Sequence, residues 1–295
     1  MAKATLLFLA TDDGLALLSN PAGQGRWVRS IHTLRGSTVH SVWVDGSNPL
    51  ITLVIADGRV HRSTDGAQTW TELPIGDPLA PGAALYSAPR QPSFVGLLAG
   101  NILLISDDAG ASWQRIALPG AYGAFAIDDA GRFYGALGAQ VLASDNHGAT
   151  WELYGTLLPD APFALIAAPR AAETLCALVG GRVYVGERAG WRLIDGMPGE
   201  AIAFTILASA TPTLIAALAD GGTARGSLDG WEPAIAAFPW TGAATVLTSA
   251  RYHIDTAFVA SAAGEVAMST DRGRSWTLVR RGLAAVRDLV AARLM

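Results

Sequence analysis

The chain has 295 residues and a formal net charge of −4, with 51% hydrophobic and 16% charged residues. A chain of this length can build a full core without disulfides or metals, and its apolar content lies well above that of disordered proteins. Its longest apolar runs, such as residues 4–10 and 163–168, are too short for a membrane-spanning helix, which needs about 20 residues. The acidic balance also argues against nucleic acid as a partner.

The content of cysteine and histidine further limits the chemistry. The single cysteine, Cys176, excludes an intramolecular disulfide, and its apolar surroundings predict a buried thiol and not a nucleophile. The five histidines show no spacing typical of zinc ligands, so we expect neither a metal nor a cofactor. The first ten residues are at the short limit for a signal peptide and no small-residue cleavage site follows. We therefore expect a cytoplasmic protein.

Strand signals recur along the chain in a fixed order. The first predicted strand spans residues 4–10. The next unit has strands over 38–45 and 50–56, an Asp-Gly hairpin signal, a strand over 59–63 and an outer strand over 70–73. Later units repeat the second hairpin at residues 99–100, 180–181, 220–222 and 263–264. Four short strands in about 42 residues are typical of one blade of a β-propeller.

Tryptophan marks the repeat. Seven of the nine tryptophans lie at positions 27, 70, 113, 151, 191, 231 and 276, which are 38 to 45 residues apart. The interval from the last of these positions, through the end of the chain and back to the first, is of the same size. Such spacing is expected of seven equal units that close into a ring.

Most of these tryptophans end a recurring octamer, S-x-D-x-G-x-[ST]-W. Aspartate can fold its side chain back onto a tight turn, glycine supplies a positive φ, the hydroxyls satisfy further backbone groups, and tryptophan can fill the space between neighbouring sheets. The copies are anchored at Ser63, Asp65 and Trp70; Ser106, Asp108, Gly110 and Trp113; Ser144, Asn146, Gly148 and Trp151; Ser269, Asp271, Gly273 and Trp276; and, shortened, Asp229 and Trp231.

This octamer resembles the Asp box of the BNR-repeat propellers, a group that includes sialidases, xyloglucan-active hydrolases, sortilin-type receptors and the photosystem II assembly factor family. The resemblance extends over the whole chain. It implies an all-β fold with one domain over residues 1–295, a single seven-bladed β-propeller of four-stranded antiparallel blades.

The ends of the chain predict how the ring closes. Residues 286–291 resemble residues 39–44, the first strand of the second unit, whereas the N-terminus begins at a second strand. We therefore expect the C-terminal strand to join the N-terminal blade, which removes an open sheet edge. A short C-terminal helix over 284–294 is the alternative, because this segment contains good helix formers.

The octamer aspartates are expected to be structural, because they recur once per blade whereas a catalytic group is needed once. One carboxylate per turn also falls short of the six to eight oxygens that calcium takes. Ligands of propellers usually bind at the mouth of the central channel, which we place at the loops leading into each first strand. The residues assigned to this mouth are Arg35, His40, Leu79, Tyr86, Tyr122, Phe125, Phe163, Phe204, Trp240 and Arg287.

Trp240 lies outside the repeat register, so an exposed aromatic beside arginine could serve as a hot spot for a partner. The alternative is that these aromatic residues cap the blade cores and fill the channel.

Three classes of function follow from the resemblance. A glycoside hydrolase needs two carboxylates in one cleft, but Asp77, Asp160 and Glu200 are not paired in the sequence, and the F/Y-R-I-P motif of sialidases is absent. A non-catalytic scaffold or assembly factor that binds a protein or peptide at the channel mouth is therefore the main prediction. A carbohydrate-binding or carbohydrate-hydrolysing propeller is the alternative.

Overall fold

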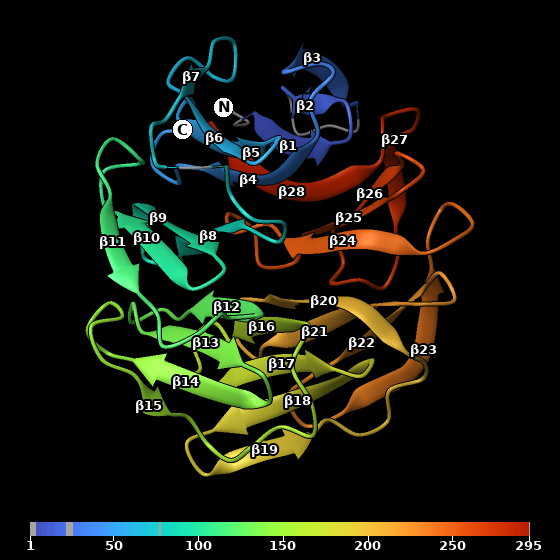
Figure 1. The fold of residues 1–295 in the computed structure, drawn as a ribbon. Helices are drawn as coiled ribbons and strands as arrows, with labels where there is room; N and C mark the ends of the chain where they lie inside the picture. Colours follow the sequence, from blue (N-terminus) through green and yellow to red (C-terminus); the bar gives the residue numbers. More distant parts are fainter. Residues whose placement is uncertain (1–3, 22–25, 77, 295) are drawn as a thin grey trace.

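Each repeat unit of the sequence folds into one antiparallel sheet. A computed structural model describes residues 4–21, 26–76 and 78–294. In these ranges every regular element is a strand, and 28 strands form seven four-stranded sheets in a ring (Figure 1). The predicted seven-bladed propeller is confirmed. No helix in the described ranges is long and apolar enough to cross a membrane.

The blades are numbered along the chain, and their strands are given from the channel outward. Blade 1 contains β28 (Val286–Arg293), β1 (Thr5–Thr11), β2 (Gly14–Asn20) and β3 (Val28–Thr33). Blade 2 contains β4 (Val39–Val44), β5 (Thr52–Ala56), β6 (Arg59–Ser63) and β7 (Thr71–Glu72). Blade 3 contains β8 (Ala84–Ala88), β9 (Gln91–Ala99), β10 (Ile102–Ser106) and β11 (Gln114–Ala117).

The second half of the ring follows the same pattern. Blade 4 contains β12 (Ala124–Ile127), β13 (Phe133–Leu137), β14 (Gln140–Ser144) and β15 (Glu152–Leu153). Blade 5 contains β16 (Ala164–Ala167), β17 (Leu175–Val179), β18 (Arg182–Glu187) and β19 (Gly190–Leu193). Blade 6 contains β20 (Ala201–Leu207), β21 (Thr213–Leu218), β22 (Gly222–Gly226) and β23 (Trp231–Ala237), and blade 7 contains β24 (Ala244–Ser249), β25 (Ala257–Ser261), β26 (Val266–Ser269) and β27 (Thr277–Arg280).

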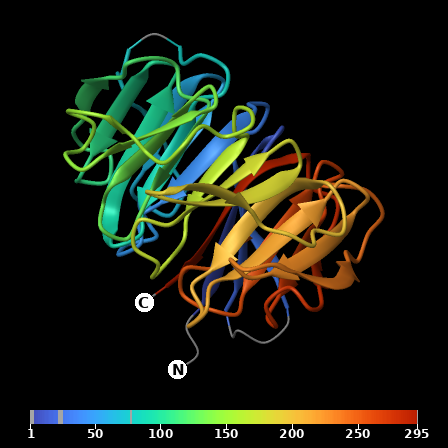
Figure 2. The same ribbon diagram turned by 90° about the horizontal axis from the view of Figure 1, so that it is seen from below.

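The ring closes through its C-terminal strand, as predicted. β28 pairs with β1 in antiparallel register, with Leu7 opposite Ala291, and the two strands run side by side in Figure 2. The amide of Leu294 also donates to the carbonyl of Ala4 at 3.0 Å. Pairing along the free edge of β1 and burial of Val286 and Leu289 outweigh the helix propensity of this segment.

The core is divided among the contacts between blades. Seven clusters of buried apolar side chains occur in the described residues, and each joins two neighbouring blades. Tryptophans of the repeat enter these clusters edge-on. Trp151 lies 5.2 Å from the Tyr122 ring, and Trp276 lies 5.6 Å from the Phe238 ring. The prediction that repeat tryptophans fill the space between sheets is consistent with these contacts.

The octamers form closed hydrogen-bonded turns between the third and fourth strands. In blade 3 the Ser106 hydroxyl donates to Asp108 at 2.7 Å and accepts the Gly110 amide at 2.8 Å. The Asp108 carboxylate also accepts the amide and the hydroxyl of Ser112, at 2.8 and 2.6 Å. The turn's own donors therefore occupy this carboxylate, which supports a structural role.

One octamer shows why glycine can shift its place. Residues 109 and 110 both have positive φ (55° and 78°), and so do Gly66 and Ala67 in blade 2 (77° and 68°). Ala67 stands where the other copies have glycine, and its amide still donates to the Ser63 hydroxyl at 2.9 Å. The turn thus needs two successive left-handed residues, one of which can be alanine at some cost in strain.

The carboxylates of these turns predict that the stability of the fold decreases at low pH. Hydrogen bonds from Thr69 lower the pKa of Asp65 from 3.8 to about 2, and those from Ser112 lower the pKa of Asp108 to about 2. A carboxyl with a depressed folded-state pKa stabilises the fold fully above its unfolded pKa, and this stabilisation is lost as the pH falls from about 4 towards 2. We expect an Asp65→Asn/Asp108→Asn variant to lose less melting temperature over this range than the wild type, as measured by circular dichroism.

Blade 4 supplies a natural control for this experiment. Its octamer has Asn146, whose side chain makes the corresponding bonds to the Thr150 amide and hydroxyl, both at 2.8 Å. Asparagine therefore fits the turn without a charge. The reverse change, Asn146→Asp, should steepen the acid loss, and equal slopes in all three proteins would contradict the assignment.

Candidate functional site

The two faces of the ring carry different loops. The octamer turns lie beside the turns that join each innermost strand to the next strand. In blade 2, the amide of Gly66 in the octamer donates to the carbonyl of Leu50 in the β4–β5 turn at 2.9 Å. In blade 7, the amide of Arg272 in the octamer donates to the carbonyl of Asp255 in the β24–β25 turn at 3.0 Å. We call this side the octamer face. The opposite side, the loop face, carries the loops that lead into each innermost strand, where the sequence predicted the binding site.

On the loop face, four of the predicted residues are exposed: Arg35, His40, Phe163 and Arg287. Arg35 and His40 face solvent, and Phe163 is 76% exposed. Arg287 forms a bidentate ion pair with Asp12, with both N–O distances 2.7 Å, and this pair lowers the pKa of Asp12. Arg287 therefore links the closing strand β28 to the β1–β2 turn.

Two of the predicted residues fill the cores between blades. Tyr122 is 6% exposed and packs in the space left by Gly135, where a Cβ would collide with its ring. Phe204 is 4% exposed in the cluster between blades 5 and 6. Neither ring is available to a partner at the surface, which agrees with the alternative that the sequence left open.

The remaining aromatic residues lie elsewhere. Tyr86 and Phe125 pack 5.1 Å apart and line the channel, and burial raises the pKa of Tyr86 to about 12. Trp240 is half-buried and stacks on Phe238 at 5.0 Å. Because some of the predicted residues are exposed and others are buried, they do not form one continuous surface.

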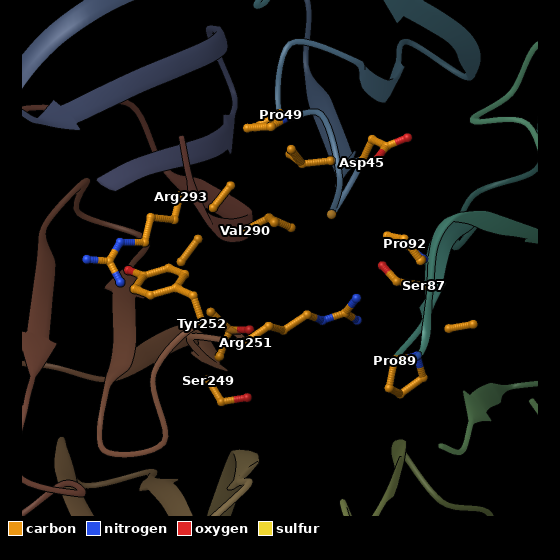
Figure 3. Close-up of a pocket in the computed structure, with 16 residues that line it drawn as sticks. Asp45, Pro49, Ser87, Pro89, Pro92, Ser249, Arg251, Tyr252, Val290 and Arg293 are labelled. Atoms are coloured by element: carbon orange, nitrogen blue, oxygen red, sulfur yellow. The ribbon is translucent and has the colours of Figure 1, made fainter. Parts of the chain in front are cut away.

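The central channel is bounded by all seven blades. A cavity of about 550 Å³ touches every innermost strand, and its lining includes Val42, Tyr86, Phe125, Leu165, Ile206, Thr248 and Leu289. A second cavity of about 590 Å³ lies beside it. Its walls come from the far end of β28 and from the turns after β4, β8 and β24, so it lies at the octamer face. Its lining includes Asp45, Pro49, Ser87, Pro89, Pro92, Arg251, Tyr252 and Arg293 (Figure 3).

Arginine dominates the charge at this end of the channel. Arg90, Arg170 and Arg251 follow the innermost strands of blades 3, 5 and 7 and line the two cavities. None of the three forms an ion pair with an acidic side chain of the described chain. Asp129 lines the same channel cavity and accepts the Arg170 amide at 3.0 Å, so it offsets part of the positive charge of these guanidinium groups.

Arg251 reaches furthest into the cavity. Figure 3 shows its side chain extending across the middle, towards the wall that carries Ser87 and Pro89. Arg251 is exposed to this open cavity, and an arginine stays protonated at neutral pH. Arg293 instead lies over the Tyr252 ring, 6.0 Å from its centroid, and burial raises the pKa of Tyr252 to about 12.

The carboxylate nearest this cavity holds its own loop in place. Asp45 accepts the Ser47 amide and hydroxyl at 2.7 and 2.6 Å, the Asn48 amide at 3.0 Å and the Ser93 hydroxyl at 2.8 Å. Burial raises its pKa, but these bonds outweigh burial and the pKa lies below its ordinary value. Figure 3 shows Asp45 turned away from Arg251.

A second carboxylate lies deeper in the channel wall. Asp288 accepts the Val42 amide at 2.9 Å and the Ser41 hydroxyl at 3.2 Å. Burial raises its pKa, and these hydrogen bonds oppose the effect. Within the described ranges, no group of three or more His, Cys, Asp or Glu side chains could hold a metal ion.

The sequence contained a signal for this cavity that residue spacing alone did not reveal. The triplet Ala-Pro-Arg follows the innermost strand in blade 3 (88–90) and in blade 5 (168–170), and Ser-Ala-Arg takes the same place in blade 7 (249–251). Arginines at one position of several blades converge on the axis of a ring. They lie on the octamer face because each innermost strand runs towards that face.

No protein-family model matches the chain, and no curated protein matches it. Solved structures do. YCF48 from Cyanidioschyzon merolae is 14% identical, with a TM-score of 0.62 over 83% of this chain and 87% of that chain. A structure of YCF48 bound to D1 peptide is 14% identical, with a TM-score of 0.50 over 94% of this chain and 81% of that one.

A bacterial protein covers the ring more completely. Apo AztD from Citrobacter koseri is 12% identical, with a TM-score of 0.62 over 99% of both chains. At these identities the comparisons establish the fold alone: the chain is a seven-bladed β-propeller similar in architecture to YCF48 and AztD.

Proposed function

We propose that this chain is a non-catalytic propeller scaffold that binds a protein or peptide partner, and that the partner enters the cavity at the octamer face. The observation that carries the proposal is the cavity itself, about 590 Å³, a size at which pockets bury most of a small ligand. We further propose that the octamers are Asp boxes whose role is to shape this face.

The walls suit an extended peptide segment. Pro49, Pro89 and Pro92 give the cavity rigid apolar surface, and Tyr252 adds an aromatic side chain with a polar end. Rigid walls lower the entropy lost on binding. The solved structure of YCF48 with a D1 peptide shows that a propeller of similar architecture takes a peptide, and this supports the same class of partner here.

Hydrolysis of a glycosidic bond fits the cavity less well. It needs two carboxyl groups on either side of the bond. Asp45 and Asp288 lie near the cavities, but each is engaged by hydrogen bonds from its own wall. A glycan panel nevertheless belongs in the test, because aromatic and arginine side chains also bind sugars.

The proposal predicts a binding site that a bulky residue can close. Ser87 lies in the cavity wall in Figure 3, so Ser87→Trp should fill the space. We expect a displayed library of random peptides to yield binders of the wild type that lose at least about tenfold in affinity for Ser87→Trp. Affinities would be measured by calorimetry on variants with unchanged melting temperature.

The matched control is Phe163→Ser on the loop face. Phe163 is 76% exposed, so its replacement should leave both stability and peptide binding unchanged. Peptides that lose affinity for Phe163→Ser, and not for Ser87→Trp, would instead place the site on the loop face. Failure to recover any peptide, together with a positive glycan panel, would replace the protein partner by a carbohydrate.

A further inference from the structure

Arg251 lies in a turn that does not need it. The turn between β24 and β25 is closed by the His253 amide, which donates to the Ala250 carbonyl at 3.1 Å, and by the Ala250 amide, which donates to the Thr256 carbonyl at 2.9 Å. Arg272 ties the same turn to the octamer through an ion pair with Asp255. Removal of the Arg251 side chain would leave all these contacts in place.

Arg132 and Arg287 form ion pairs, whereas no ion pair of Arg251 is found within residues 4–21, 26–76 and 78–294. Arg132 contacts three carboxylates, and Arg287 donates hydrogen bonds from two nitrogens to the Asp12 carboxylate. Among the residues that the structure describes, Arg251 has no acidic side chain within 4 Å and no hydrogen bond to one. Arg251 is exposed to the open cavity, and a guanidinium without a counter-charge is available to bind an anion.

We propose that Arg251 anchors a carboxylate of the ligand in the cavity at the octamer face. Arg90 and Arg170, from two other blades, lie at the same end of the channel, where Asp129 offsets part of their charge. The projecting guanidinium of Arg251 offers two parallel N–H donors, which match the two oxygens of a carboxylate.

The carboxylate has two possible sources. Under the proposed function, on which this part of the inference rests, it is an acidic side chain or chain end of the bound peptide. The same chemistry is carried by a free dicarboxylate. Binding of a small carboxylate tests whether Arg251 holds this group. Binding of peptides tests whether the carboxylate comes from a peptide.

The first arm of the test uses glutarate and its neutral analogue glutaramide as probes of the intact protein. We expect calorimetry to show binding of glutarate, weakened about 10- to 100-fold by Arg251→Gln, and no binding of glutaramide. The affinity of Arg251→Lys for glutarate should lie between those of the wild type and Arg251→Gln, because lysine keeps the positive charge but lacks the two parallel N–H donors of arginine. Arg115→Gln is the control, since Arg115 is exposed on β11, outside both cavities.

The second arm uses the peptides selected on the wild type. We expect them to contain aspartate, glutamate or a required free C-terminus, and neutralising that group should weaken binding to the wild type but not to Arg251→Gln. This non-additivity is the signature of a direct contact. Binding should also weaken as salt is raised.

The outcomes separate this inference from the proposed function. Neutral peptides that bind in the cavity regardless of Arg251 would leave the function standing and overturn the anchor. Glutarate that binds through Arg251 when no peptide is recovered would support the anchor, assign it to a small carboxylate and overturn the peptide partner. The inference also fails if Arg251→Gln changes neither glutarate nor peptide binding, or if glutarate does not bind and peptide binding does not depend on a carboxylate.

Discussion

Trp276→Ala is expected to lower the free energy of unfolding by about 3–5 kcal/mol. Trp276 is 9% exposed in the cluster between blades 6 and 7. Its ring lies edge-on to Phe238 at 5.6 Å, and its indole N–H donates to the Thr223 hydroxyl of blade 6 at 3.1 Å. Alanine would leave a cavity between two sheets and remove the hydrogen bond to Thr223, whose hydroxyl would keep its bond to the Ala236 carbonyl. Denaturation by urea, followed by tryptophan fluorescence and circular dichroism, measures the loss.

Trp240→Ala provides the comparison for this experiment. Trp240 is half-buried and packs against the same cluster, where its ring stacks on Phe238 with 5.0 Å between the ring centroids. Its removal takes away one aromatic contact without opening the interface between blades, so we expect a loss of about 1–2 kcal/mol. Equal losses for the two variants would show that the repeat tryptophan has no special place in the contact between blades.

Arg132→Ala is expected to cost about 3 kcal/mol. The Arg132 side chain is 4% exposed, and its nitrogens lie 2.9 Å from Asp145, 2.7 Å from Glu152 and 3.0 Å from Glu173. Glu173 belongs to blade 5, so the cluster joins two blades. Loss of the arginine removes the one cation that contacts all three carboxylates, and leaves only the exposed Arg188 beside Glu152 and Glu173. The expected value lies at the low end of the range for breaking a buried ion pair, because the carboxylates are partly exposed and screened.

Arg188→Ala is the matched control, because it removes a cation from the same cluster. Arg188 also contacts Glu173, at 2.9 Å, but its side chain is 58% exposed. Water and salt screen a surface ion pair, which contributes little to stability, so this variant should unfold almost as the wild type does. A loss as large as that of Arg132→Ala would show that burial of Arg132 is not the cause of its effect.

Much of the fold could be read from residues that recur at one place in each blade. The octamer serine, aspartate and tryptophan act within a single turn or between adjacent blades, so their spacing alone predicts the number of blades and the position of each turn. Closure could also be predicted, because residues 286–291 repeat the pattern of an innermost strand and Ala4 begins at a second strand. Local preference for a helix in this segment yielded to pairing with β1.

The candidate site was harder to predict, because its residues act across the ring. The sequence placed Tyr122 at the channel mouth from its loop position, but the missing side chain at Gly135 allows its ring to lie in the core. Trp240 stands outside the repeat register and still has a packing partner in Phe238. Position in a loop does not reveal whether an aromatic side chain turns inward or outward.

By itself, the sequence determined a ring of seven four-stranded blades and the hydrogen-bonded turns that define one face of it. These properties follow from local patterns repeated at a fixed period. Only the tertiary structure decided that a cavity opens at the octamer face and that Arg251 projects into it. The physical reason is that the walls of this cavity come from blades 1, 2, 3 and 7, whose residues are far apart in the chain and meet only when the ring has closed.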